Sequence, residues 1–120
     1  MTRRDATLPA PLTAAVQAIH DLKGVDVKVL DLRGLTDATD FFVVASGTSE
    51  GHVRGLGQKV LDALEACGWG SHHAEGLATG RWVLIDAVDV VVHLFHPETR
   101  RFYQLERLWG DAPQVAVGAR

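Results

Sequence analysis

The sequence is poor in cysteine, in net charge and in long apolar runs. Its single cysteine, Cys67, cannot form an internal disulfide, which fits a reducing cytoplasm. No apolar run approaches the roughly 20 residues that a membrane helix needs, and the first twelve residues lack the apolar core of a secretory signal. The net charge of −3 provides no general basic field for nucleic acid or an anionic membrane. We therefore expect a cytoplasmic protein with no membrane contact and no direct sequence-specific nucleic-acid binding.

The 120 residues have the composition of one globular domain, with 47% hydrophobic and 22% charged residues. We predict a flexible N-terminus over residues 1–10, a domain over residues 11–112 and a flexible tail over residues 113–120. Apolar periodicity predicts helices over 11–23 and 49–67 and from Pro97 onward, and strands over 25–32, 41–46, 69–75, 82–86 and 89–95. The fold class is α/β (α+β), a mixed five-stranded sheet with flanking helices. The continuous apolar run 41–46 is the best candidate for its middle, and 25–32 for a strand near an edge.

Residues 82–86 and 89–95 are predicted to form an antiparallel hairpin. A two-residue turn at Ala87 and Val88 would give the pairs Asp86–Asp89, Leu84–Val91 and Trp82–His93. Valine disfavours the positive φ of such turns, so a wider turn and a shifted register remain open. Alternation gives one aliphatic face, and a mixed face with an indole, a histidine and two carboxylates.

The mixed face has two interpretations. In the first, Trp82 belongs to the core and His93 is a hydrogen-bonded partner beneath the last helix. In the second, the face is an exposed recognition patch with tryptophan as its anchor. Three short helices leave part of a five-stranded sheet uncovered, and we place the patch there. On the last helix, Arg100 is expected to remain in solvent.

The turn of residues 46–49 resembles a phosphate-binding loop that opens a helix. A nucleotidyltransferase-like metal-dependent enzyme would also need two closely spaced carboxylates on a neighbouring strand. Asp86 and Asp89 are the only comparable pair. They lie three apart across a turn, so plain helix capping is the favoured interpretation and the enzyme is the alternative.

The histidines and the cysteine do not form a convincing metal or catalytic set. His72 with His73, and His93 with His96, would each point to opposite faces of a strand, so neither pair is expected to chelate zinc. Cys67 falls on the apolar stripe of the helix over 49–67, where a small buried side chain is expected. We predict no cofactor, no metal and no catalytic residue.

Three segments carry a family resemblance: ATDFFVVASGTS (38–49), GRWVLIDAVDVVVHLF (80–95), and RRFYQLERLW (100–109) followed by Asp111 and Ala112. In order and spacing they resemble the ribosomal silencing factor family, also called the Iojap family. The resemblance implies a nucleotidyltransferase-like fold without the catalytic carboxylates, and no enzyme activity. It also implies binding to the large ribosomal subunit through its fourteenth protein. Such binding would prevent the small subunit from joining and repress translation when nutrients are scarce.

The resemblance also implies a site. Trp82, Val83 and Leu84 would belong to the contact surface, with Asp86, Asp89 and His93 around it. We expect Asp86, Asp89 and Glu106 to pair with basic side chains of the ribosomal protein. The sequence departs from the family pattern at Val88, where glycine is usual. A homodimer is compatible with the apolar content and with the family.

Overall fold

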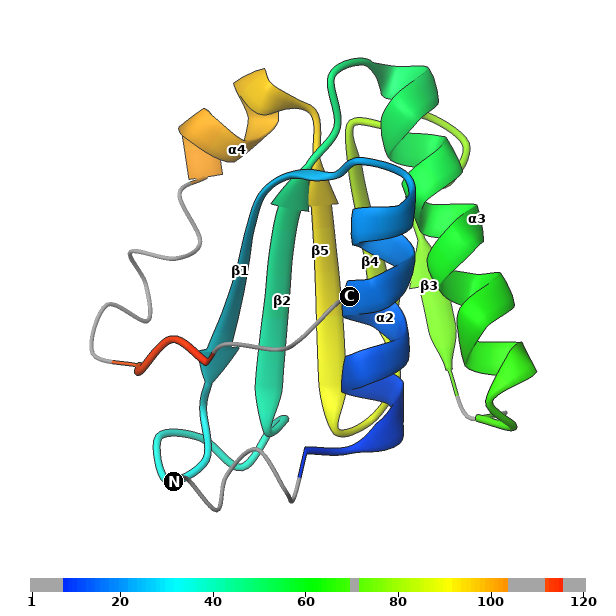
Figure 1. Ribbon diagram of the computed structural model, residues 1–120. Coiled ribbons are helices and arrows are strands. Elements are labelled where there is room, and N and C mark those ends of the chain that lie inside the picture. Colours follow the sequence, from blue (N-terminus) through cyan, green and yellow to red (C-terminus); the bar gives the residue numbers. More distant parts are fainter. Residues whose placement is uncertain (1–7, 70–71, 104–111, 116–120) are drawn as a thin grey trace.

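The computed structural model describes residues 8–69, 72–103 and 112–115, without the side chains of 101–103. The elements in chain order are α2 (Ala10–Asp21), β1 (Val25–Asp31), β2 (Phe41–Ser46), α3 (Glu50–Ala66), β3 (His73–Glu75), β4 (Trp82–Asp86), β5 (Val90–Phe95) and α4 (Pro97–Tyr103) (Figure 1). Each predicted helix and strand of the domain has a counterpart. No helix in the described ranges is both long and apolar enough to span a membrane.

The strands form one mixed sheet in the order β1-β2-β5-β4-β3. β2 and β5 are parallel, and the other neighbouring pairs are antiparallel. This confirms the predicted mixed five-stranded sheet of an α+β fold. β1 is an edge strand, as expected, whereas the middle position predicted for β2 is occupied by β5, with β2 beside it in the interior.

Helices α2 and α3 both cover the same face of the sheet (Figure 1). Their apolar stripes supply Leu12, Val16 and Ile19 from α2 and Val53, Leu56, Val60 and Leu64 from α3 to one buried cluster. Gly57 allows the close approach of α3 to β4, because a Cβ there would lie 3.1 Å from Val83 Cγ1. The start of α3 is capped by Ser49, whose hydroxyl accepts the His52 N–H at 3.1 Å.

The outer edge of β1 is paired with residues 113–115. The Asp31 N–H donates to the Pro113 carbonyl, and the Val115 N–H donates to the Val29 carbonyl, each at 2.9 Å. Leu30 and Gln114 form the antiparallel bridge between these contacts. These three residues, which lie in the predicted C-terminal tail, thus extend the sheet beyond β1. Backbone pairing along an unpaired strand edge satisfies donors and acceptors whatever the side chains are, which explains why composition did not indicate it.

The hairpin of β4 and β5 forms, but its register differs from the predicted one by two residues. Trp82 pairs with Phe95, Leu84 with His93, and Asp86 with Val91. The difference arises at the turn, where Val88 has φ +73° and the Asp89 N–H donates to the Ala87 carbonyl at 2.9 Å. A shift of two residues keeps every side chain on its predicted face.

Candidate functional site

The candidate site is the sheet face opposite α2 and α3, called here the outer face. Strand alternation places on it Trp82, Leu84 and Asp86 of β4, Val91, His93 and Phe95 of β5, and Phe42 and Val44 of β2. The registers bring these residues together, because His93 is paired with Leu84 on one side and with Val44 on the other. This part of the outer face is thus built by three adjacent strands, with Leu30 of β1 packed beside Phe42.

Burial on the outer face falls toward β4 and toward the tip of the β4–β5 hairpin. Val44 and Phe95 are fully buried and His93 is 5% exposed. The side chains left half-buried are Phe42, Trp82, Leu84 and Val91, with Asp86 exposed beside them. This gives an apolar patch of four side chains with a carboxylate at one end, which is the composition of a protein-binding surface with an aromatic anchor and a charged rim.

His93 lies at the centre of an aromatic cluster. The Trp82 indole Nε1–H donates to His93 Nδ1 at 3.3 Å. The Phe42 ring meets the imidazole edge-on, with centroids 4.7 Å apart, and the Phe95 ring stacks parallel to it at 6.1 Å. The Trp82 and Phe95 rings lie 5.1 Å apart. The indole is therefore held both by ring packing and by one directional hydrogen bond.

The imidazole of His93 is neutral at physiological pH. Burial lowers the pKa of His93 from 6.5 to about 4, because the charged form would lose its hydration. Since Nδ1 accepts the indole hydrogen bond, the ring proton is on Nε2. Nε2 is buried and has no hydrogen-bond partner among the described residues. The buried ring thus carries one satisfied acceptor and one unsatisfied donor.

The acidic end of the outer face is organised by the turn between β4 and β5. Asp86 Oδ1 accepts the Val88 N–H at 2.9 Å, and the Thr39 hydroxyl donates to the Val88 carbonyl at 3.2 Å. The Asp89 carbonyl accepts the N–H groups of Asp40 and Phe41. These bonds fix the hairpin tip against the start of β2, and the Asp86 side chain remains exposed.

The predicted site residues fall into three groups. Trp82 and Leu84 are half-buried on the outer face, Asp86 is exposed, and Asp89 is half-buried at the hairpin tip. His93 is buried beneath Trp82 and cannot itself offer a contact surface. Val83 is 0% exposed on the opposite face, packed in the core, so its expected contact with a partner is wrong. Glu106 lies outside the described residues.

Two members of the patch were not among the predicted residues. Phe42 lies in the continuous apolar run of β2, where no polar residue marks one side chain as facing outward. Alternation from the buried Phe41 nevertheless places Phe42 on the outer face. Val91 was placed on the mixed face but not in the site. The two are paired across β2 and β5, so they form one apolar unit beside His93.

Two further expectations are corrected. Arg100 is 7% exposed: its Nη1 donates to the Ser46 hydroxyl and to the Asp26 carbonyl, each at 2.9 Å. Its Nη2 lies 3.4 Å from the carboxylate of Asp26, which itself stays exposed. Asp26 lies at the irregularity of β1 and has φ +52°. Cys67 is exposed at the end of α3, where its Sγ donates to the Leu64 carbonyl at 3.3 Å.

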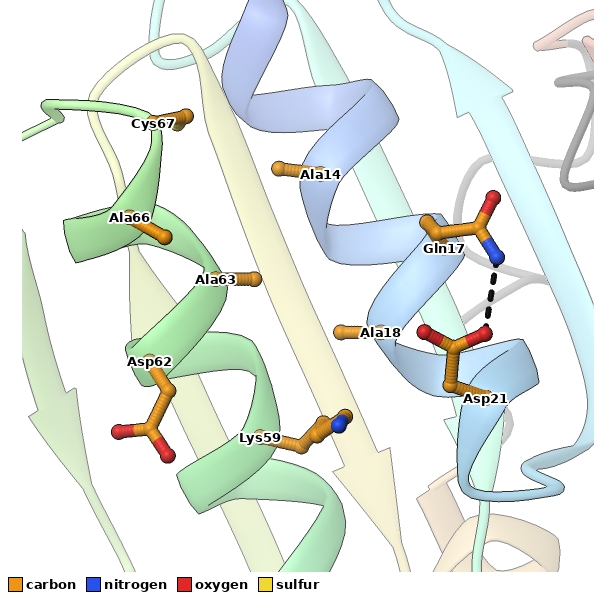
Figure 2. A pocket seen from close by; sticks show the side chains of 9 residues that line it. All are labelled: Ala14, Gln17, Ala18, Asp21, Lys59, Asp62, Ala63, Ala66 and Cys67. Atoms are coloured by element: carbon orange, nitrogen blue, oxygen red, sulfur yellow. Dashed lines mark hydrogen bonds between the residues drawn. The ribbon is translucent and has the colours of Figure 1, made fainter.

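A groove of about 470 Å³ runs between α2 and α3 on the other side of the molecule. Its floor consists of small side chains, with Ala14 and Ala18 of α2 directed toward Ala63 of α3 (Figure 2). Gln17 donates to Asp21 at 2.9 Å along its rim. These groups satisfy one another locally, and none of them is a buried polar group directed into the groove.

The chain is similar to known proteins over most of its length. Residues 5–119 match the sequence model of a family described as ribosomal silencing factor during starvation. The chain belongs to this family. It is 41% identical over 106 residues to the ribosomal silencing factor of Halalkalibacterium halodurans, covering 88% of this chain and 91% of the relative. It is 36% identical to the chloroplastic protein Iojap of Arabidopsis thaliana, covering 94% of this chain and 47% of that one.

Solved structures agree with the family assignment. A crystal structure of a Chromobacterium violaceum protein superposes with a TM-score of 0.82 at 38% identity, covering 93% of this chain and 96% of that chain. The resemblance seen in the three sequence segments is confirmed. The family description and the name of the bacterial relative both denote a silencing factor, which is a regulatory role.

The loop before α3 is filled by the chain itself. A Cβ at Gly47 would lie 2.9 Å from the Val53 backbone nitrogen, and the Ser46 hydroxyl is buried against Arg100. No three His, Cys, Asp or Glu side chains of the described ranges gather where they could hold a metal ion. The Asp86 carboxylate is engaged by the turn. In this family member, the geometry therefore favours helix capping at the loop over phosphate binding.

Proposed function

We propose that this chain represses translation by binding the large ribosomal subunit through its fourteenth protein and blocking association with the small subunit. The family assignment supports the class of function. The observation that carries the site is the half-buried Trp82 on the outer face, flanked by Phe42, Leu84 and Val91. The mechanism is occupancy: the bound chain covers surface that the small subunit needs, and no chemical step is required.

In such an interface, the apolar patch supplies most of the binding free energy, and the charged rim acts mainly on the association rate. Trp82 is the expected hot spot, since truncating a central tryptophan costs roughly 2 kcal/mol or more of binding free energy. Asp86 and Asp89 would meet lysine and arginine side chains of a basic ribosomal protein. Exposed charges of this kind act mainly on the association rate and are screened by salt.

The test is co-sedimentation of the purified chain with isolated large ribosomal subunits. Trp82→Ala should raise Kd about 30-fold or more, and Leu84→Ala should weaken binding to a smaller extent. Leu77→Ala is the matched control, because Leu77 is also half-buried but lies against Gly57 on the α3 side. It should bind as the wild type does.

The charge contribution is tested by Asp86→Asn. This variant keeps an oxygen for the Val88 N–H and removes only the charge, so binding should weaken at low salt and approach the wild type at high salt. Asp62→Asn makes the same change on the exposed face of α3, where Asp62 accepts a hydrogen bond from Gln58. It should leave binding unchanged at both salt concentrations.

The silencing step is tested by mixing large and small subunits with the chain and separating the products on a sucrose gradient. The wild type should reduce the joined ribosomes, and a folded Trp82→Ala variant should not. Absence of binding to large subunits would refute the proposal. A rise in melting temperature on adding magnesium and a nucleotide would instead support the enzyme alternative, because a ligand stabilises the fold that binds it.

A further inference from the structure

The imidazole of His93 makes a hydrogen bond to Trp82 that an apolar ring filling the same space could not make. The His93 side chain is buried, with 5% of its surface exposed. Its Nε2 donor has no hydrogen-bond partner within the described part of the chain. An unsatisfied buried donor is unfavourable, and an apolar ring of similar size would avoid it. What the imidazole provides in exchange is an acceptor, Nδ1, at 3.3 Å from the Trp82 indole nitrogen.

We infer that His93 is the positioning residue of the outer face, and that its Nδ1 holds the Trp82 indole in one orientation for the partner. The inference rests on the proposed function. His93 contributes to binding although it is buried, and it does so only through Trp82. The hydrogen bond is donated by Trp82 of β4 to His93 of β5, diagonally across the strand pair in which Trp82 pairs with Phe95 and Leu84 with His93.

The physical need for such a residue follows from the torsions of an aromatic side chain. Rotation about χ2 is broad and roughly two-fold, so ring packing alone tolerates an indole turned over. Phe95 packs against the Trp82 ring at 5.1 Å with an interplanar angle of 33°, a contact that does not depend on which edge carries the N–H. The hydrogen bond to Nδ1 removes that degeneracy, because only one orientation places Nε1 near His93.

A neutral imidazole with the proton on Nε2 is required, and the environment supplies it. Among the described residues, the rings in contact with His93 are those of Phe42, Trp82 and Phe95, and none of these three is charged. The fixed tautomer has its own signature in the folded wild type: nitrogen NMR should show an unprotonated Nδ1 and a protonated Nε2. A protonated Nδ1 would overturn the inference, since such a ring could not accept the indole N–H.

The binding experiment is a double-mutant cycle with isolated large ribosomal subunits. His93→Phe keeps an aromatic ring but removes the acceptor, and should raise Kd roughly fivefold, as expected for one neutral hydrogen bond. His93→Asn keeps an amide oxygen at the position of Nδ1 and should bind more tightly than His93→Phe. If His93 acts through Trp82, then adding His93→Phe to Trp82→Ala should weaken binding no further.

Each outcome separates the inference from the proposed function. Additive losses in the cycle, or wild-type affinity in His93→Phe, would refute the positioning role while leaving ribosome binding established. Absence of binding by the wild type would refute the proposed function and the positioning role together. Circular dichroism and the melting temperature of each variant show that the compared chains are folded, so that a loss of binding is not a loss of fold.

Discussion

Replacing Val88 by glycine should stabilise the protein, although it deletes an apolar side chain. Val88 has φ +73°, a conformation that is strained for a β-branched residue by roughly 1–3 kcal/mol. Asp86 and Thr39 hold its N–H and carbonyl and so fix the strained geometry. Glycine adopts this backbone conformation without strain. It also gives the unfolded chain more conformational entropy, which lowers the free energy of unfolding by about 0.5–1 kcal/mol. The side chain is 55% exposed, so little burial is lost.

The net expectation is a gain of about 1 kcal/mol in the free energy of unfolding, which corresponds to a rise in Tm of about 4 °C for a chain of this length. Urea unfolding followed by circular dichroism measures it. Val88→Ala keeps a Cβ and should gain less. Val25→Gly is the matched control: Val25 is 44% exposed, lies in β1 and is not among the positive-φ residues. It should lose about 0.5–1 kcal/mol.

The reasoning fails if Val88→Gly destabilises the protein as much as Val25→Gly does. That result would mean that the turn geometry is not strained for valine, or that the side chain contributes more packing than its exposure indicates. If Val88→Ala and Val88→Gly gain equally, the relief would come from removing the branched side chain and not from the freedom of glycine at positive φ.

Three further predictions concern stability. Between pH 6.5 and about 4, the unfolded state binds a proton at His93 that the folded state excludes, so stability is lost as the pH falls. From pH 7 to pH 5 the wild type should lose about 2 kcal/mol more than His93→Phe in urea titrations; equal losses would contradict this. Arg100→Leu should lower the free energy of unfolding by about 2–3 kcal/mol, because the Ser46 hydroxyl and a backbone carbonyl lose a charged donor; a loss under about 0.5 kcal/mol in thermal unfolding would refute its bracing role. His52→Ala removes the acceptor of the Thr48 N–H at 2.8 Å, so hydrogen exchange at that amide should accelerate, and unchanged exchange would argue against the contact.

Much of the fold could be predicted from sequence because its signals are local. Period-two alternation assigned both faces of the hairpin correctly, including the buried Val83 and Ile85 on the aliphatic side. Local signals also explain the ends of α3, where Ser49 caps the first turn and Gly68 follows the last turn with φ +81°. The outer face was also predicted as a mixed face, since a two-residue error in register does not change which side a residue occupies.

The remaining features depend on contacts between distant parts of the chain. Arg100 appeared to be a solvent-facing residue because its partners, Asp26 and Ser46, lie 74 and 54 positions away. Val83 was included in the site because it sits between Trp82 and Leu84 in the quoted motif, although adjacent strand residues point in opposite directions. A contiguous motif identifies a family well, but only alternation and burial identify which of its residues reach a partner.

The position of β5 has a consequence for how the protein is made. It is the last strand in the sequence, yet it lies between β2 and β4, and its parallel pairing joins Phe41 to Val90. A nascent chain that ends before β5 therefore holds two separate sheet fragments, with the β2 edge unpaired. Pairing across such a sequence separation forms late and slowly. The outer face is completed only after residue 95 has been synthesised, so shorter chains lack the surface through which we propose that the protein acts.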